Sequence, residues 1–121
     1  MNSSVVYSIA DKTNDRRIAM NSQFKKGVLD MCVLAILSSG DSYGYDVAEV
    51  LSKKIELADG TVYPILRKLA TDGLVTTYLQ ESKSGPPRKY YHITDVGRVR
   101  LEEDRKDWNN FSSEVNEILG G

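Results

Sequence analysis

Apolar residues recur at helical spacing along residues 24–38, written FKKGVLDMCVLAILS. One stripe consists of Phe24, Val28, Met31 and Ala35, and a second consists of Leu29, Cys32, Val33, Ile36 and Leu37. A helix with apolar residues on more than one face is buried on more than one side. The pattern therefore predicts a helix that has neighbours on several sides.

A second helix is predicted over residues 43–54, where Val47, Val50 and Leu51 share one face. Ser42 precedes it, and a serine side chain is well suited to bond the free amides of a first helical turn. Ser42 is therefore the expected N-cap.

A third helix is predicted over residues 59–71, with Asp59 as its expected N-cap. Its apolar stripe follows the i, i+3, i+4, i+7 pattern and consists of Val62, Ile65, Leu66 and Leu69. Pro64 would lie late for a proline of the first turn, so an irregular first turn is expected. Gly73 follows and ends the helix.

Strand-forming residues replace the helical pattern from residue 74. The segments 74–80 and 88–93 are predicted strands, and the residues between them are a long hairpin loop that extends from the body. Pro86 and Pro87 stiffen its tip, and Gly85 allows the backbone to approach a partner closely. The segment 82–89 is therefore a candidate binding element.

A long helix is predicted over residues 95–119, capped by Thr94. Its apolar residues follow a heptad-like spacing and are Leu101, Trp108, Phe111, Val115 and Ile118. The spacing favours packing against a second copy of the chain, and the alternative is that this helix folds back on its own core.

The order of helix, helix, helix, hairpin and helix predicts a mostly α fold with a small β-hairpin (α+β). It is the order of a winged helix-turn-helix with a long C-terminal dimerisation helix. Residues 1–19 are expected to be a flexible leader or arm, residues 20–93 the winged helix-turn-helix, and residues 94–121 the dimerisation helix.

The charged residues are distributed unevenly along the chain. The 121 residues have a formal net charge of −1, and 40% are hydrophobic, which predicts one domain with a modest core. Residues 52–100 carry nine Lys/Arg against five Asp/Glu, whereas residues 101–121 carry two against six. The central excess indicates a cationic face, or else an ordinary surface with uneven charge.

Several functional classes are disfavoured by what the sequence lacks. His92 and Cys32 are the only residues of their types, Cys32 lies in a predicted buried helix where its thiol would be inert, and no cluster of metal ligands appears. No glycine-rich phosphate loop is present. We therefore expect no enzyme, no cofactor and no bound metal. A single thiol and the absence of a signal peptide or membrane span predict a cytoplasmic protein.

The third helix and the hairpin carry the chemistry of a DNA contact. With the apolar stripe buried, the helix would present Thr61, Tyr63, Arg67 and Lys68 to a major groove. Arg67 paired with a guanine edge would contribute about 1–3 kcal/mol of base discrimination. The phosphate contacts expected from the wing are Lys83, Arg88 and Lys89. Alternatively, Arg67 and Lys68 are solvated surface cations.

Two segments, DGTVYPILRKLATDGLV and GPPRKYYHITDVGR, resemble the signature of the PadR family of bacterial transcriptional regulators. YGYDV, which starts at Tyr43, resembles the start of that family's second helix and adds Tyr43 to the candidate DNA contacts. The resemblance implies a homodimer formed by the last helix, a near-palindromic DNA operator, and repression of transcription. It also implies that proline is usual at the position of Pro64.

The chain length resembles the short branch of the family, whose multidrug-sensing members bind flat aromatic compounds between two tryptophans of the dimer. The resemblance assigns this role to Trp108, with Phe24 and Met31 lining the site. Ser112 departs from the acidic residue that drug-binding relatives have there. Alternatively, Trp108 is only dimer core.

A second functional class remains open, a winged-helix module for protein interaction or ligand binding without sequence-specific DNA binding. Such a module predicts apolar or acidic residues on the exposed face of the third helix. The presence of Arg67 and Lys68 there favours DNA.

Overall fold

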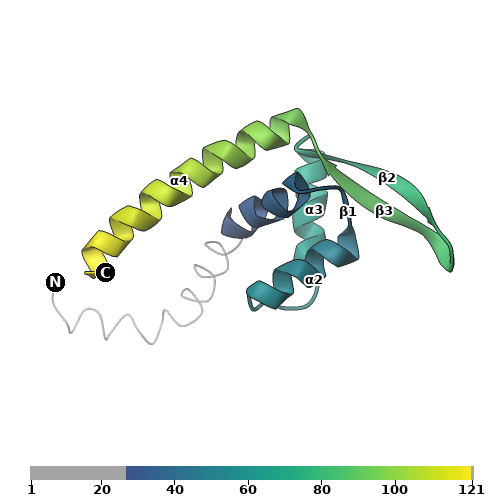
Figure 1. Ribbon diagram of the computed structural model, residues 1–121, viewed down its shortest axis with the longest axis horizontal. Helices are drawn as coiled ribbons and strands as arrows, with labels where there is room; N and C mark the ends of the chain where they lie inside the picture. Colours follow the sequence, from purple (N-terminus) through teal and green to yellow (C-terminus); the bar gives the residue numbers. More distant parts are fainter. Residues whose placement is uncertain (1–26, 121) are drawn as a thin grey trace, which may run out of the picture.

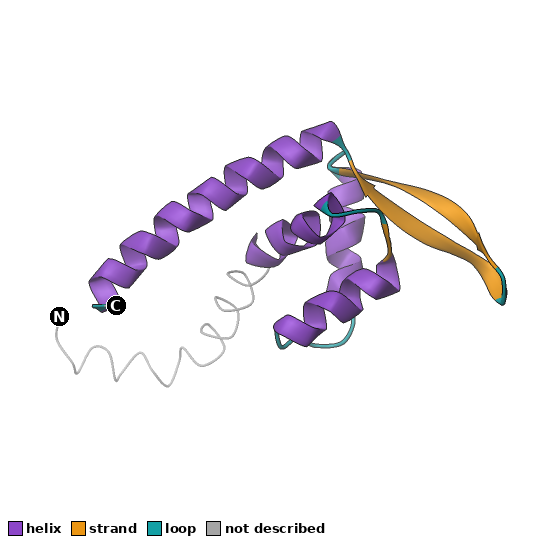
Figure 2. Ribbon diagram, in the orientation of Figure 1, coloured by secondary structure: helices purple, strands orange, loops and turns teal. Residues whose placement is uncertain are grey.

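The computed structural model describes residues 27–120, and the predictions for residues 1–19 and for Phe24 lie outside them. Residues 27–38 form a helix, here called the N-terminal helix. The elements that follow are β1 (Ser42–Tyr43), α2 (Gly44–Lys54), α3 (Val62–Thr71), β2 (Val75–Ser82), β3 (Gly85–Ile93) and α4 (Asp95–Leu119). The hairpin and α4 project from the cluster of shorter helices in opposite directions (Figures 1 and 2). The predicted mostly α fold with a small sheet is confirmed.

The core lies where the N-terminal helix, α2 and α3 meet the base of the hairpin. The predicted stripe of α3 is buried, with Leu66 fully inaccessible and Ile65 exposing only 2% of its surface. Val33 and Leu37 of the N-terminal helix and Val47 of α2 are likewise inaccessible. The apolar spacing therefore identified most of the core, but it was wrong for Val50, which is exposed, and it missed Leu34, which is buried.

The predicted starts of α2 and α3 are wrong. Ser42 does not cap α2, because it belongs to β1, and its hydroxyl donates to the carbonyl of Gly40 over 3.5 Å. Asp59 does not cap α3, which begins at Val62 after Thr61. Pro64 is then the third residue of the helix, a first-turn position where no intrahelical amide bond is lost. The expected irregular first turn is not required.

The predicted hairpin is confirmed, but its predicted long loop is wrong. The register pairs Ser82 with Gly85, so the strands are joined by the short turn at residues 83–84, and an irregularity lies between Gln80 and Ser82. β3 therefore includes Pro86 and Pro87. Prolines are tolerated there because β1 pairs only with the inner residues Tyr90 and Tyr91, leaving the outer part of β3 with one neighbouring strand.

α4 begins as predicted. The Thr94 hydroxyl accepts a hydrogen bond from the Gly97 amide over 3.0 Å and donates one to the carbonyl of Gly73 over 2.8 Å. Gly97 is buried so closely against Leu74 that a Cβ would overlap the Leu74 carbonyl oxygen. After Leu101, α4 contributes no further residue to the buried core of the described chain. The first turns of α4 are thus fixed to the body, and the rest extends away from it (Figure 1).

Candidate nucleic-acid interface

A groove of about 380 Å³ separates α3 from the hairpin and is the candidate DNA-binding site. α3 contributes Tyr63 and Arg67, and the hairpin contributes Thr77 and Lys89. Its complete lining is Tyr43, Gly44, Tyr63, Arg67, Ala70, Thr71, Thr77, Lys89 and Tyr91. Two cations and several hydroxyl groups therefore face one opening, which is the chemistry that binds a phosphate backbone.

The base of this groove is fixed by the packing of two tyrosines on Gly44. A Cβ at Gly44 would lie 3.2 Å from Cε1 of Tyr91 and 3.3 Å from Cε1 of Tyr63, so only glycine fits easily between these rings. Burial is the main cause that raises the pKa of Tyr63, so its phenol, which is protonated near neutral pH in any case, can donate a hydrogen bond. Tyr63 is still 45% exposed and can reach a partner outside the protein.

Arginine and lysine side chains near the groove have different surroundings. Among the described residues Arg67 makes no ion pair, so its guanidinium is available to an external acceptor. The Lys89 ammonium lies 5.7 Å from the centre of the Tyr91 ring, and the Arg88 guanidinium lies 5.1 Å from the centre of the Tyr43 ring. Contacts of this kind hold cations on a surface without neutralising them.

Not every predicted DNA contact lies at this groove. Lys68 turns toward the N-terminal helix, where its Nζ lies 3.2 Å from Oδ2 of Asp30. Lys83 lies in the turn at the tip of the hairpin. Thr61 precedes α3, and its hydroxyl donates to the carbonyl of Ala58 over 2.6 Å. The structure thus brings together Tyr43, Tyr63, Arg67 and Lys89, with Arg88 beside them.

A second groove, of about 470 Å³, lies between the N-terminal helix and α4. It brings Met31 and Trp108 together, as the predicted ligand site requires. The sequence did not reveal that Asp30, Asp104 and Asp107 line the same groove. Oδ1 of Asp30 is buried and has no hydrogen-bond partner among the described residues.

The outer half of α4 carries exposed apolar side chains. Phe111 is 54% exposed, Ile118 85% and Leu119 75%, whereas Val115 is half-buried. Trp108 is 36% exposed. Side chains of this size seldom gather on a surface that faces only water. Leu119, which the predicted stripe did not include, belongs to this surface.

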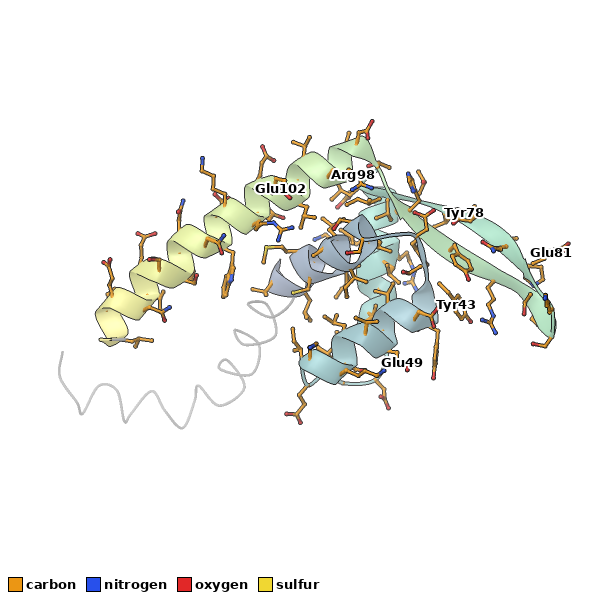
Figure 3. The ribbon with its side chains drawn as sticks, viewed as in Figure 1. Tyr43, Glu49, Tyr78, Glu81, Arg98 and Glu102 are labelled. Atoms are coloured by element: carbon orange, nitrogen blue, oxygen red, sulfur yellow. The ribbon has the colours of Figure 1, made fainter. Side chains whose placement is uncertain are left out.

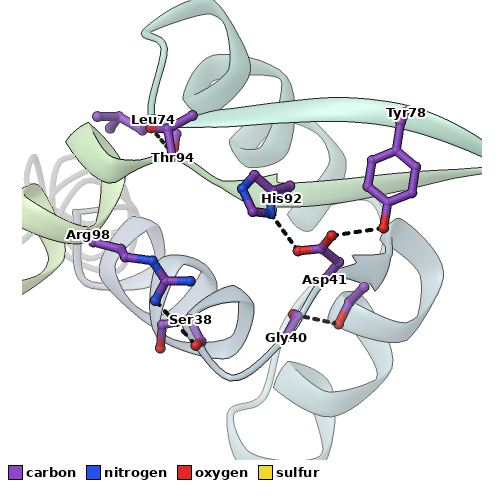
Figure 4. Close-up of polar contacts among 9 residues, drawn as sticks. Ser38, Gly40, Asp41, Leu74, Tyr78, His92, Thr94 and Arg98 are labelled. Atoms are coloured by element: carbon purple, nitrogen blue, oxygen red, sulfur yellow. Dashed lines mark hydrogen bonds and ion pairs between the residues drawn. The ribbon is translucent and has the colours of Figure 1, made fainter.

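A polar cluster joins the body to the hairpin on its other face (Figure 4). Asp41 lies before β1, and its Oδ2 accepts a hydrogen bond from the Tyr78 hydroxyl over 2.8 Å. Its Oδ1 lies 2.7 Å from Nδ1 of His92. The bonds from His92 and then Tyr78 hold the pKa of Asp41 below its usual range, and the bond to Asp41 raises the pKa of Tyr78. Sequence analysis missed this cluster because its members are far apart in the chain.

The described residues contain no group of three or more His, Cys, Asp or Glu side chains arranged to hold a metal ion. Within residues 27–120 no helix combines the length and the apolar character that crossing a bilayer requires.

A helix-turn-helix pair, a two-stranded wing beside its second helix and a long C-terminal helix define a winged-helix protein. The chain belongs to the transcriptional regulator PadR-like family, which matches residues 33–103.

Solved and curated relatives agree with this assignment. The structure of a PadR-like transcriptional regulator from Bacillus cereus is 40% identical, has a TM-score of 0.73, and is matched over 82% of this chain and 98% of that one. The transcriptional regulator Rv3488 of Mycobacterium tuberculosis is 30% identical over 100 residues, 82% of this chain and 90% of the relative. The negative transcriptional regulator PadR of Bacillus subtilis is 29% identical over 82 residues, 63% of this chain and 44% of the relative.

Proposed function

We propose that this regulator acts as a homodimer that binds a near-palindromic DNA operator with α3 and the wing. The observation that carries the proposal is the groove in which Arg67 of α3 and Lys89 of the wing face the same opening. In winged helix-turn-helix proteins the second helix of the pair enters a major groove, and the wing lies beside it on the backbone.

The groups around the groove divide into base-reading and phosphate-binding roles. Arg67 extends from the exposed face of α3 and is proposed to pair with a guanine edge. Tyr43 and Tyr63 are proposed to donate hydrogen bonds to phosphates, whereas Thr61, whose hydroxyl proton is donated to Ala58, is proposed to contact a thymine methyl. The proposed ion pairs with phosphates come from Lys83, Arg88 and Lys89, and each contact releases a counterion and makes binding salt-dependent.

Lys68 provides a matched comparison for Arg67. Both are exposed cations on α3 and adjacent in sequence, but Lys68 is already paired with Asp30 of the N-terminal helix. We therefore propose that Lys68 contributes to DNA affinity only through its general positive charge.

The proposed dimer buries the exposed apolar residues of α4 against a second copy of the chain. Phe111, Val115 and Ile118 are spaced as in a coiled coil, and Leu119 extends their surface. In a two-fold dimer each residue of this surface contributes twice. The dimer would present two copies of α3 about one DNA turn apart, which matches a near-palindromic operator.

An effector site is proposed at the groove between the N-terminal helix and α4. Met31 and Trp108 offer a flat apolar surface, and Phe24, outside the described residues, is proposed to extend it. Asp30 and Asp104 of this groove are paired with Lys68 and Arg100, which also line it, so the carboxylate proposed to favour a flat aromatic cation, in spite of Ser112, is that of Asp107. Such a ligand would release DNA only if it binds more tightly to a dimer spacing that disfavours the operator.

Repression in the bacterial cytoplasm is the proposed outcome of binding. It rests on the family and on the Bacillus subtilis relative, which is named a negative regulator and is matched over only part of its length. We propose no catalytic activity. The competing function is a winged-helix module that binds proteins or ligands without sequence-specific DNA binding.

Selection of duplexes from a random-sequence library by the purified protein tests the proposal. The expected result is an enriched near-palindrome that binds the wild-type protein far more tightly than unrelated DNA. Arg67→Ala should weaken binding by about 1–3 kcal/mol and relax the preference at one base pair of each half-site, whereas Lys68→Ala should retain the preference. No enrichment by the wild-type protein would refute sequence-specific binding and favour the competing module.

A further inference from the structure

Asp41 connects three segments that are distant in the sequence. It lies in the loop between the N-terminal helix and β1, and its carboxylate contacts Tyr78 of β2 and His92 of β3 over 2.8 and 2.7 Å. Both carboxylate oxygens are used, one for each strand of the hairpin (Figure 4). A single side chain of the body thus holds both strands of the wing.

Among residues 27–120, few other polar contacts attach the wing to the body. β1 pairs only through Ser42 with Tyr91 and through Tyr43 with Tyr90. The outer part of the hairpin receives its backbone hydrogen bonds from its own two strands. A two-stranded ribbon has a variable twist and is marginally stable by itself, so its direction depends on contacts at its base.

The two contacts of Asp41, with Tyr78 and with His92, are together called the bracket. At its Tyr78 end lies a row of aromatic rings. Tyr78 stacks on Tyr90 with ring centres 5.7 Å apart, and Tyr90 lies 6.2 Å from Tyr43. Tyr43 also lies under the guanidinium of Arg88. Figure 3 shows Tyr78 on the hairpin and Tyr43 near the start of α2. The position of Tyr78 is therefore linked to that of a proposed phosphate contact.

The bracket lies on the face of the hairpin that does not line the α3 groove. Directly paired residues share a face, so Tyr78, Tyr90 and His92 point one way. Thr77, Lys89 and Tyr91 alternate with them and line the groove. Asp41 therefore contacts the face of the hairpin opposite Lys89, the face from which Tyr90 and Arg88 also extend.

We propose that Asp41 is a positioning residue that sets the angle of the wing for DNA binding and does not itself contact DNA. The inference rests on the proposed DNA-binding function. Asp41 would thus strengthen binding to DNA, although both the side chain and the DNA are negatively charged. If Asp41 acted only through its charge, removing the carboxylate would lessen repulsion of phosphates and tighten binding.

The sign of the change in DNA affinity distinguishes the two possibilities. Asp41→Ala is expected to weaken binding to the selected duplex about three- to tenfold and to lower the slope of log K against log salt by about 1, as if one phosphate contact of the wing were lost. Tyr78→Phe should have a smaller effect in the same direction. The double variant should match Asp41→Ala, because the two residues act through one contact.

Glu81→Ala is the matched control. Glu81 lies on the same hairpin near its outer end, and none of the described residues bonds its carboxylate (Figure 3). Glu81→Ala removes the same negative charge but leaves the contacts of Asp41 in place. This variant should bind DNA as tightly as the wild-type protein or more tightly. Thermal unfolding of each variant confirms that the protein is folded at the assay temperature.

Hydrogen exchange of the free protein supplies a readout that does not need DNA. Amides of β2 and β3 should exchange faster in Asp41→Ala, while those of α3 stay unchanged. Faster wing exchange together with weaker, less salt-dependent DNA binding supports the inference. Unchanged exchange, unchanged or tighter DNA binding by Asp41→Ala, or additive effects in the double variant would overturn it. Absence of DNA binding by the wild-type protein would instead refute the proposed function, and with it the role of Asp41 toward DNA.

Discussion

Replacing Ile118 by serine tests whether the exposed end of α4 is a dimer interface. Ile118 exposes 85% of its surface, the largest exposed fraction among the large apolar residues of the described chain. Complete burial of an isoleucine side chain is worth about 1.5–3 kcal/mol, so burying this fraction would contribute about 1.3–2.5 kcal/mol per copy. A two-fold dimer contains the residue twice, which gives about 2.5–5 kcal/mol for the pair.

The expected dimer of Ile118→Ser is therefore weaker by a factor of about 70 to several thousand. Sedimentation equilibrium over a range of protein concentrations measures this dissociation constant directly. Val99→Ser is the control, because Val99 is 60% exposed on the same helix but lies off the heptad-like stripe. A dissociation constant unchanged by Ile118→Ser, or raised equally by Val99→Ser, would refute the assignment of this surface.

Three further predictions concern groups whose surroundings the structure defines. The pKa of Asp41 is lowered, so its hydrogen bonds are present above the usual aspartate range and are lost as pH falls through the lowered pKa. An NMR titration that follows its carboxyl carbon should therefore have a midpoint below that of an ordinary aspartate. Asp41→Ala should lower the pKa of Tyr78, measured by NMR of the ring, because the bond to Asp41 is the main cause that raises it; no change would contradict that cause. Gly97→Ala should destabilise the protein by about 1–3 kcal/mol or more in thermal unfolding, since the added methyl would overlap the carbonyl of Leu74, whereas an unchanged midpoint would show that α4 is not held there.

Much of the core was predictable because the spacing of apolar residues along the sequence indicates which side chains are buried. Val62, Ile65, Leu66 and Leu69 are buried as their periodicity predicts, and Thr94 caps α4 as its position before a helical segment predicts. Such features depend on residues within one or two turns of each other. The order of elements follows from them, and with it the winged-helix class.

The ends of the elements were less predictable because they depend on distant partners. Ser42 is a strong N-cap by local preference, but pairing with Tyr91 makes it a strand residue. Pro86 and Pro87 indicate a loop by local preference, but an open strand edge accepts them. Ser42 thus takes its conformation from a partner about 50 residues away, and the prolines are accepted because β1 pairs only with the inner residues Tyr90 and Tyr91 of β3.

At the candidate DNA-binding site, the directions of single side chains were also hard to predict from the sequence. Arg67 and Lys68 are adjacent cations on one helix, and the sequence assigned both to the DNA-binding face. Neighbouring residues of a helix point about 100° apart, which is enough to direct Arg67 into the groove beside the wing and Lys68 toward Asp30. Composition cannot distinguish them, because the difference comes from which element packs on each side of α3. A comparison of Arg67→Ala with Lys68→Ala therefore tests the geometry of the surface, since a surface that bound DNA only by its net charge would respond equally to both.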